Sequence, residues 1–370
     1  MEQSFATKIN FDVGVIKELD VNSFKNVLVL TGTQYSLEIF EKHIKPLIKT
    51  NVHVYANIAA TNLTEHSVYS VLNFASGNNI DCIISVGVES VMDCGRLTSL
   101  LLTHGGFLHD YIPGGTMGPI GITPNVIYHI TVPIMPAAGY EISSYASFMQ
   151  SNEKKMLISP YLIPKATYID PMLMTGLPPD LWAVLGFDCF TTAMMAYVSI
   201  YANPTSDAYA EQALKSYIQF SKKIIAKPAD IELIKHAAAA SINSFLAANY
   251  SCTGPVHAIA DVLAAKFGMR YGIALAMVCA EVCAFCYDAS PERFDSVVKM
   301  LGGKGGSGTA VKKTIEKLIK DVGIQLPSLK GKIKDNEYEK FAHEAMNYAM
   351  KGCAKQMSVR DIEALLRRLP

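Results

Sequence analysis

The pattern of apolar and polar residues differs between the two halves of the chain. In the first half, short runs rich in valine, leucine and isoleucine end in turn residues, and segments with helical periodicity separate them. The runs are Lys25 to Gly32, Asn51 to Asn57 and Ile80 to Gly87, and the helical segments lie around Ser36 to Lys49 and Thr64 to Ser76. Strands that alternate with helices are typical of a parallel sheet covered on both faces. The pattern therefore predicts an α/β domain.

Beyond Asp170, nearly every segment has the period of a helix, with hardly any strand signal in between. The predicted helices are Leu181 to Ile200, Asp207 to Ile225, Asp230 to Asn249, Val256 to Phe267, Gly272 to Tyr287, Pro291 to Leu301 and Thr309 to Val322. The stretch from Leu177 to Asp180 joins a proline pair to a helix start, which places the boundary there. We expect an α/β domain over residues 1–177 and an all-helical domain over residues 178–370.

Composition and charge exclude several classes of partner. Half of the 370 residues are apolar, and 33 basic residues balance 33 acidic ones. The chain has no net positive charge that would attract nucleic acid or an anionic membrane. Small molecules or other copies of the chain are therefore the expected partners. The first residues lack a basic start followed by an apolar run, and no segment approaches about 18 uninterrupted apolar residues. Neither a signal peptide nor a membrane span is expected, and the protein is predicted to be cytoplasmic.

The eight cysteines are expected to be reduced thiols, because the protein is predicted to be cytoplasmic. Cys279, Cys283 and Cys286 can share one face of a helix. A tetrahedral thiolate site would need a fourth ligand, and the sequence offers none, so we expect these cysteines to pack inside a buried helix. The glycine-rich stretch Gly302 to Thr309 lacks P-loop spacing and does not follow a strand. It is predicted to be a flexible loop before a helix.

The third apolar run leads into Gly87, Val88, Glu89 and Ser90, where a helix is predicted to begin. Phosphates bind at such a loop between a strand and a helix, because free amides of the helix point outward there. Glycines usually line the loop, whereas Val88 adds bulk and Glu89 adds negative charge, so dinucleotide binding should be weakened. An ordinary strand-to-helix turn with Ser90 as the N-cap explains these residues equally well. A second stretch, Ile130 to Phe148, is expected to form the opposite wall of the same crevice.

The helical half contains a histidine with an acidic neighbour on the same helix face. His257 and Asp261 are four residues apart. A histidine on a mostly apolar helix is more commonly a packed core residue than a ligand, but a carboxylate beside it either orients the imidazole or shares an ion with it. Asp188 lies on another predicted helix, Leu181 to Ile200, and has no metal-binding residue four positions later.

These pieces together resemble the iron-containing alcohol dehydrogenases, relatives of dehydroquinate synthase and glycerol dehydrogenase, over nearly the whole chain. The matching stretches are KNVLVLTGTQ, GVES followed by Asp93, VPIMPAAGYE, ATYIDPMLMTGLPP, GFDCFTTAMMAY and GPVHAIADVLAAKFGMRYG, in the order of the family. The resemblance implies a Rossmann-like domain followed by an all-helical domain, the dehydroquinate synthase-like fold. It also implies a homodimer.

The resemblance places the metal site of the family in the helical half. Asp188 and His257 occupy the places of the aspartate and of one of the three histidines that bind the metal, while Thr192 and Tyr271 stand where the other two histidines would be. A hydroxyl and a phenol are poor ligands for iron or zinc because both are neutral near pH 7. A divalent metal is therefore expected to be absent or to bind weakly. If one binds, its expected ligands are Asp188, His257 and Asp261. Asp261 replaces a further histidine near the reacting groups.

The resemblance also assigns cofactor contacts in the first half. The assigned residues are Gly87, Val88, Glu89, Ser90 and Asp93 in the glycine motif, and Ile134, Met135 and Ala138 in the second stretch. Ile134 and Met135 replace two threonines expected to touch the cofactor, and Lys154 lies where relatives carry a lysine near the crevice. Binding of NAD(P)(H) is expected to be weakened, and the choice between NAD and NADP stays open.

Three functions are compatible with these residues. The first is an oxidoreductase that acts on a small alcohol, aldehyde or ketone with NAD(P)(H) but without the usual metal. Its candidate catalytic residues are Tyr271, His257, Asp261 and Lys154, with the phenol of Tyr271 as the group that hydrogen-bonds a carbonyl oxygen and donates a proton. The second is a non-catalytic binding or assembly subunit, since both the metal and the pyrophosphate motifs depart from the family. The third is a lyase or synthase on the same scaffold.

Overall fold

The computed structural model describes residues 7–112, 121–136, 138–151, 153–347 and 350–370. The chain divides into two compact units, Met1–Thr175 and Gly176–Pro370. The predicted boundary at residue 177 lies close to this division. Ala137, which belongs to the second predicted crevice stretch, lies outside the described residues.

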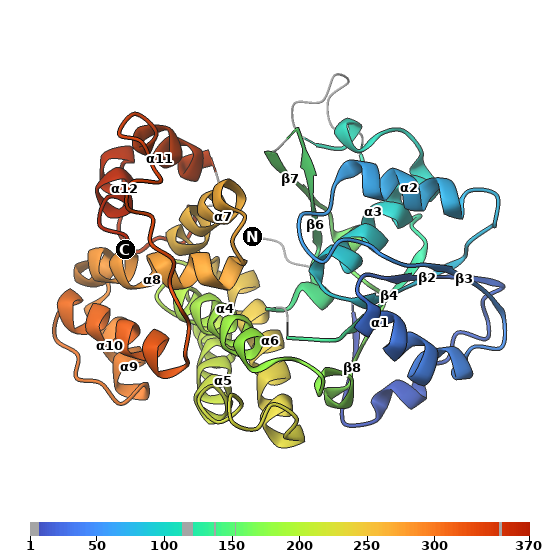
Figure 1. The fold of residues 1–370 in the computed structure, drawn as a ribbon, viewed down its shortest axis with the longest axis horizontal. Helices are drawn as coiled ribbons and strands as arrows, with labels where there is room; N and C mark the ends of the chain where they lie inside the picture. Colours follow the sequence, from blue (N-terminus) through green and yellow to red (C-terminus); the bar gives the residue numbers. More distant parts are fainter. Residues whose placement is uncertain (1–6, 113–120, 137, 152, 348–349) are drawn as a thin grey trace. The chain divides into compact units, whose positions relative to one another are not determined.

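The first unit is built around a six-stranded sheet. Its strands are β1 (Lys8–Phe11), β2 (Asn26–Thr31), β3 (Asn51–Tyr55), β4 (Cys82–Gly87), β5 (Tyr128–Pro133) and β8 (Ala166–Ile169). Their order is β1-β8-β5-β4-β2-β3, and all of these neighbours pair in parallel. Helices α2 (Glu65–Ala75) and α3 (Glu89–His104) lie on one side of the sheet and α1 (Gln34–Ile39) on the other (Figure 1). The prediction of an α/β domain with a parallel sheet is confirmed.

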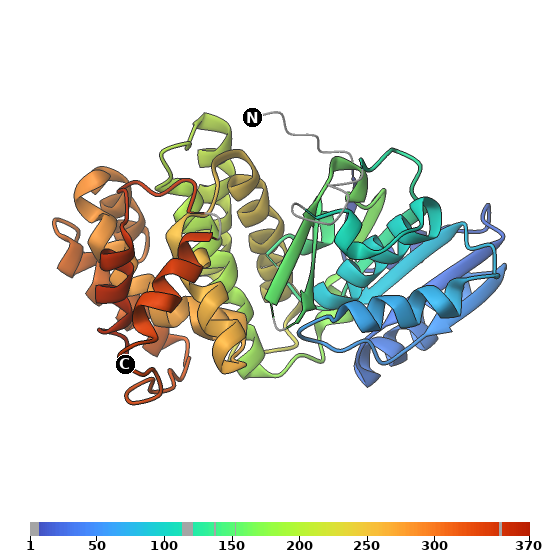
Figure 2. The same ribbon diagram turned by 90° about the horizontal axis from the view of Figure 1, so that it is seen from above.

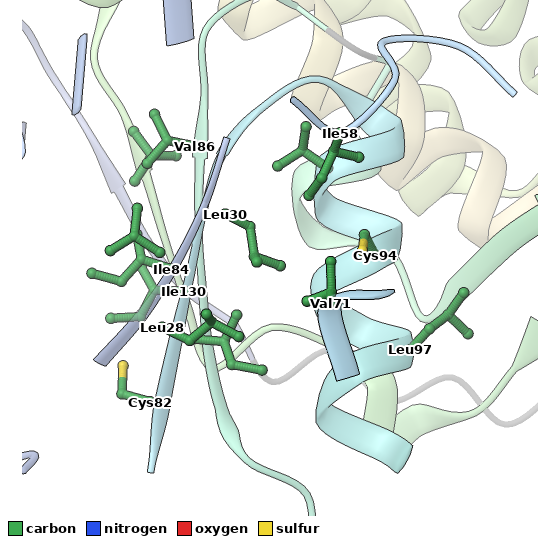
Figure 3. Packing of buried hydrophobic residues seen from close by; sticks show 14 of the residues in the cluster. Leu28, Leu30, Ile58, Val71, Cys82, Ile84, Val86, Cys94, Leu97 and Ile130 are labelled. Carbon is green, nitrogen blue, oxygen red and sulfur yellow. The ribbon is translucent and has the colours of Figure 1, made fainter. Parts of the chain in front are cut away.

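Strand β4 is buried on both faces, which explains its nearly unbroken apolar sequence. All six of its residues are buried, because helices cover both sides of a parallel sheet. Figure 3 shows Leu28 and Leu30 on the side that faces α3, with Leu97 of that helix beyond them, and Ile84 and Ile130 on the opposite side. Full burial of each such side chain is worth about 1.5–3 kcal/mol relative to exposure. The carboxyl end of β4 is therefore held firmly in place.

A buried polar contact lies where α3 crosses the sheet. Ser85 Oγ and His129 Nε2 are 2.9 Å apart on neighbouring strands, and His129 is only 4% exposed. A Cβ atom on Gly95 of α3 would overlap both of these atoms, so the helix approaches the sheet this closely only with glycine there. Burial lowers the pKa of His129 well below its ordinary value. The imidazole is therefore neutral in the folded protein near pH 7.

The lowered pKa of His129 leads to a prediction of how the stability of the protein depends on pH. As the pH falls below about 6.5, the unfolded chain takes up a proton that folded His129 does not, so the free energy of unfolding should decrease. The loss should approach about 1.4 kcal/mol per pH unit until the pKa of the folded state is reached. Urea titrations of the native protein and of His129→Asn at several pH values between about 5 and 7.5 measure this slope.

The slope should be smaller in His129→Asn. The exposed His66→Asn variant is the control for the loss of a histidine outside the core, and it should keep the slope of the native protein. An equally steep slope in His129→Asn would show that other groups cause the pH dependence.

The second unit contains helices and connecting loops, and its described residues form no strand. Its helices are α4 (Pro179–Tyr197), α5 (Pro204–Phe220), α6 (Ile231–Ser251), α7 (Pro255–Phe267), α8 (Tyr271–Cys286), α9 (Pro291–Met300), α10 (Gly308–Asp321), α11 (Tyr338–Asn347) and α12 (Val359–Leu366). Helices α4, α5 and α6 pack side by side, and α8 packs against α4, α7 and α10 (Figures 1 and 2). The prediction of an all-helical second domain is confirmed.

The seven helices predicted for this unit are all present. The glycine-rich stretch forms the loop before α10 up to Ser307, whereas its last two residues, Gly308 and Thr309, belong to α10. Helices α11 and α12 were not predicted. In the first unit, the segment predicted to be helical around Ser36 to Lys49 is helical but changes its pitch: α1 ends at Ile39, a π-helical turn follows over Phe40–Ile44, and a 3₁₀ turn follows over Lys45–Leu47. Pro46 lies inside the 3₁₀ turn, and Lys45 before it keeps a helical conformation.

Helix α8 forms the core of the second unit. Cys279, Cys283 and Cys286 are at most 1% exposed, which confirms that they pack inside a buried helix. Among the described residues, the segment Tyr271–Ala289 is the one that is long and apolar enough to cross a membrane, and 67% of its apolar window is buried within the chain. Such burial is what the core helix of a folded unit shows.

Candidate active site

The loops after β4 and β5 lie side by side at the carboxyl edge of the sheet. Gly87 is opposite Pro133 in the pairing of the two strands, and the amide of Ile134 donates to the carbonyl oxygen of Gly87 at 3.3 Å. The order of strands reverses between β2 and β4, and ligands of parallel sheets bind at the carboxyl ends of strands near such a reversal. The structure therefore brings together the two stretches predicted to wall a nucleotide crevice.

Helix α3 begins earlier than an N-cap at Ser90 would require. Its N-cap is Val88, which has no side-chain hydrogen bond to the helix, and Glu89 is its first residue. Ser90 Oγ donates instead to the carbonyl oxygen of Ala59 at 2.6 Å, so the interpretation of Ser90 as the N-cap is wrong. A carboxylate at Glu89 interacts favourably with the positive end of the helix and repels a phosphate placed there.

The second wall is tied to the end of β5. Thr131 Oγ1 donates to the carbonyl oxygen of Glu141 at 2.7 Å, which holds the turn at Ala138 close to the strand. Ala138 has a φ of 45° and is buried. Ile134 is also buried, whereas Met135 is half-buried. Of the two residues that replace the threonines of the family, Met135 has more side-chain surface available to a ligand.

Asp93 belongs to a buried hydrogen-bond network. Its Oδ1 atom is 2.9 Å from Arg96 Nη1, and the two side chains are 1% and 0% exposed. Its Oδ2 atom accepts hydrogen bonds from the amide and hydroxyl of Ser147 at 3.0 and 3.1 Å, and Arg96 Nη2 donates to the carbonyl oxygen of Tyr140. Burial raises the pKa of Asp93, and the charge of Arg96 and the hydrogen bonds of Ser147 act against this rise. The network joins α3 to the second wall.

Lys154 lies on a hairpin next to this network. Strand β6 (Tyr145–Gln150) contains Ser147 and pairs antiparallel with β7 (Glu153–Ile158), in which Lys154 is opposite Met149. The charge of Lys154 also lowers the pKa of Asp93. The candidate lysine is therefore within electrostatic range of the buried pair.

In the second unit, the candidate residues of α4, α7 and α8 come together. Thr192 Oγ1 donates to Asp188 Oδ1 at 3.3 Å and lies 3.0 Å from His257 Nε2. Which of the two atoms in the contact between Thr192 and His257 donates depends on the tautomer of the ring. The rings of His257 and Tyr271 are 6.2 Å apart between centroids. Asp261 lies one turn after His257 on α7 and is half-buried.

The donors present do not fit a four-coordinate iron or zinc site. In the described part of the chain, no group of three or more His, Cys, Asp and Glu side chains is arranged to hold a metal ion. The hydroxyl of Thr192 is a weak ligand for iron or zinc unless it is deprotonated. Thr192 occupies the space between the carboxylate and the imidazole and links them by hydrogen bonds.

Gly272 controls how closely Tyr271 and its helix approach α4. A Cβ atom on Gly272 would overlap the carbonyl oxygen of Val184 and lie 2.7 Å from Val184 Cγ1. We expect Gly272→Ala to lower the free energy of unfolding by about 1–3 kcal/mol, because two packed helices would have to separate. Equilibrium denaturation measures the effect, and Gly121→Ala, which adds a methyl group in open space, is the control. Equal stability of the two variants would contradict the close contact.

Comparison with known proteins identifies the class. A family model described as iron-containing alcohol dehydrogenase matches residues 6–171, and the C-terminal model of the Fe-containing alcohol dehydrogenase family matches residues 182–369. The chain belongs to the iron-containing alcohol dehydrogenase family. The resemblance inferred from the sequence motifs is thereby confirmed.

Individual relatives have oxidoreductase names. The chain is 26% identical to long-chain-alcohol dehydrogenase 1 of Geobacillus thermodenitrificans, over 81% of this chain and 78% of that protein. It is 25% identical to the NAD-dependent methanol dehydrogenase of Bacillus methanolicus, over 96% of both chains. Its fold matches the crystal structure of sulfoacetaldehyde reductase from Bifidobacterium kashiwanohense in complex with NAD+, with a TM-score of 0.88, 17% identity, and coverage of 100% of this chain and 98% of that one.

Arg96 and Ser147 were not predicted from the sequence. The signal for Arg96 was its position three residues after Asp93, which allows a pair on one helix face. Most such pairs are exposed, whereas this one is buried where α3 packs against neighbouring elements that include β6. Ser147 had no signal, because the hairpin that contains it was not predicted.

Proposed function

We propose that this chain is an NAD(P)-dependent oxidoreductase that interconverts a small alcohol and its aldehyde or ketone without a tightly bound metal ion. The observation that carries the proposal is the position of Thr192, hydrogen-bonded to Asp188 and His257 where the family has a metal ligand. Membership of the family and the names of the relatives support the reaction type. The soluble cytoplasm is the expected location and a homodimer the expected assembly, which light scattering coupled to gel filtration would test.

In the proposed reaction, the phenol of Tyr271 polarises the substrate carbonyl in place of a metal ion and acts as the general acid. Its hydroxyl donates a hydrogen bond to the carbonyl oxygen of the substrate and transfers its proton as hydride arrives from the reduced cofactor. His257, whose ring is next to that of Tyr271, and Asp261, one turn further along α7, are the groups that return the proton. The balance is one carbonyl, one hydride and one proton for each alcohol formed.

The proposed cofactor contacts are at the carboxyl edge of the sheet. Gly87 and the first amides of α3 face the place of the pyrophosphate, with Val88, Glu89 and Ser90 around it. The residues on the neighbouring loop are Ile134, Met135 and Ala138. The buried Asp93 acts as a positioning residue that holds this loop through Arg96. The carboxylate of Glu89 predicts weaker binding than in relatives with a glycine there.

A chelation assay tests the proposal. The purified chain is mixed with NADH or NADPH and a panel of small aldehydes and ketones, before and after prolonged treatment with EDTA. We expect the oxidation of the reduced cofactor to continue unchanged after chelation. Activity that disappears with EDTA and returns with added Fe²⁺ or Zn²⁺ would contradict the proposal.

Restoring the two missing histidines provides a converse prediction. In Thr192→His/Tyr271→His, we expect the affinity for Zn²⁺ to rise by about 100-fold or more, because imidazole is a far better ligand than a hydroxyl or a phenol. Calorimetric titration with Zn²⁺ measures the change, and Tyr271→His alone is the matched control with one ligand fewer. Native protein that binds Zn²⁺ as tightly as the double variant would show that the present side chains already form a metal site.

The position of Glu89 favours a second candidate, a non-catalytic binding or assembly subunit. Val88 and Glu89 occupy the N-terminus of α3, where a cofactor phosphate would have to approach. Calorimetric titration with NAD(H) and NADP(H) separates the two candidates. Binding counts against a purely structural role, and the lack of any binding counts against the oxidoreductase.

A further inference from the structure

Two cysteines from distant parts of the chain lie next to each other at the end of α8. Cys286 is the last residue of that helix, Cys353 lies in the segment between α11 and α12, and their Sγ atoms are 3.8 Å apart. The bond length of a disulfide is about 2.05 Å, so the two sulfurs need to move less than about 2 Å to reach it. Neither residue takes part in the proposed oxidoreductase reaction, and the inference below does not depend on it.

The two thiols differ in access and in acidity. Cys353 is partly exposed, whereas Cys286 is 1% exposed. The hydrogen bond with Cys286 lowers the pKa of Cys353 below its ordinary value, and the same hydrogen bond, together with burial, raises the pKa of Cys286. Cys353 is therefore the thiol that an external reagent meets first, and it is the one with more thiolate character.

Contacts on both sides hold the segment of Cys353 against the helices. The carbonyl oxygen of Gly352 accepts a hydrogen bond from the amide of Ile200 at 3.3 Å. Lys355 Nζ donates to the carbonyl oxygen of Phe285 at 3.4 Å and lies 4.2 Å from the centre of the Phe285 ring. These contacts keep the two sulfur atoms together in the reduced protein.

We propose that Cys353 and Cys286 form a modification site at which a low-molecular-weight disulfide, such as oxidised glutathione, introduces a reversible intrachain disulfide. The sulfur of Cys353 attacks one sulfur of the reagent, which forms a mixed disulfide and releases one reduced thiol. The sulfur of Cys286 then attacks Cys353 Sγ, which forms the Cys286–Cys353 bond and releases the second reduced thiol. Two protein thiols are oxidised, one reagent disulfide is reduced, and the two protons leave on the released thiols.

The chain contains two internal comparisons for this site. Cys279 and Cys283 have a similar sulfur separation of 3.9 Å, but both are 0% exposed, so a reagent cannot reach either of them. Cys252 is partly exposed and close to Gly352, which makes it the competing partner for Cys353. The pair Cys279 and Cys283 tests whether two neighbouring sulfurs react when no reagent can reach them. Cys252 tests whether an accessible cysteine competes with Cys286 for Cys353.

The experiment uses the folded full-length chain and oxidised glutathione. After incubation, free thiols are alkylated and the protein is digested without reductant for mass spectrometry. We expect one crosslinked peptide pair that joins Cys286 to Cys353 and disappears with dithiothreitol. The oxidised protein should also melt about 5–10 °C higher, because the crosslink closes a long loop in the second unit.

Three substitutions test each part of the site. Cys353→Ser should abolish the reaction at both positions, Cys286→Ser should stop it at a glutathione adduct on Cys353, and Cys252→Ser should leave the crosslink intact. If Cys286→Ser does not fold, Cys286→Ala replaces it. A lasting glutathione adduct on Cys353 of the native protein, a crosslink to Cys252, or a crosslink that forms only in urea would each overturn the proposal.

Discussion

Replacing Arg96 with methionine is expected to lower the free energy of unfolding by about 3–5 kcal/mol, the largest effect on stability predicted for a single substitution in this protein. The Asp93 carboxylate would then lie in a site that excludes water without the guanidinium group that is 2.9 Å from it. The hydrogen bond from Arg96 to the carbonyl oxygen of Tyr140 would be lost as well, which loosens the second wall. Denaturation in urea, followed by circular dichroism, measures the change.

The double variant Asp93→Asn/Arg96→Met separates the cost of a buried charge from the loss of packing. Removing both charges leaves an amide that can still accept hydrogen bonds from Ser147, so we expect the double variant to be more stable than Arg96→Met alone. If the double variant is less stable than Arg96→Met, the buried carboxylate is not the cause.

Replacing Tyr271 with phenylalanine is expected to lower kcat for carbonyl reduction by about 10²- to 10⁴-fold, the range for loss of a general acid. The substitution removes one oxygen and keeps the ring next to His257. The KM for the reduced cofactor should change little, because the phenol is proposed to act on the substrate oxygen. Steady-state kinetics measure both constants, and circular dichroism verifies the fold.

Tyr209→Phe is the matched control for this prediction. It removes the same atom from a tyrosine of the second unit whose ring stacks on Tyr250, away from the group around His257. Its kcat should equal that of the native protein. An unchanged kcat in Tyr271→Phe would remove the phenol from the mechanism, and a rise in KM alone would make Tyr271 a binding residue.

The elements that were predicted from the sequence are those with the strongest periodic burial. Strand β4 is buried on both faces and α8 is buried along most of its length, so nearly every residue contributes to the pattern. Helix α11 was missed because its buried residues are few and two of them are alanines. Strand β1 was missed because it has four residues and none of them is fully buried. Short elements at the edge of a unit leave too little pattern to detect.

Predictions of the site failed where the outcome depends on contacts between distant residues. Ser90 has the chemistry of an N-cap, but the carbonyl oxygen of Ala59, from another loop, takes its hydroxyl and the helix starts at Glu89. Asp93 was expected at the cofactor, which stays a prediction, and its buried pair with Arg96 was not foreseen from the sequence. The grouping of Asp188, Thr192 and His257 did follow from the motifs, because the order of motifs in a family preserves their arrangement in space.

The hydroxyl of Thr192 joins α4 to α7 with hydrogen bonds that the chain makes by itself. Under the proposed metal-free mechanism, newly synthesised molecules complete this junction as soon as the two helices meet, with nothing to acquire from the surroundings. A cell starved of iron or zinc would then accumulate the folded protein as readily as a well-supplied cell.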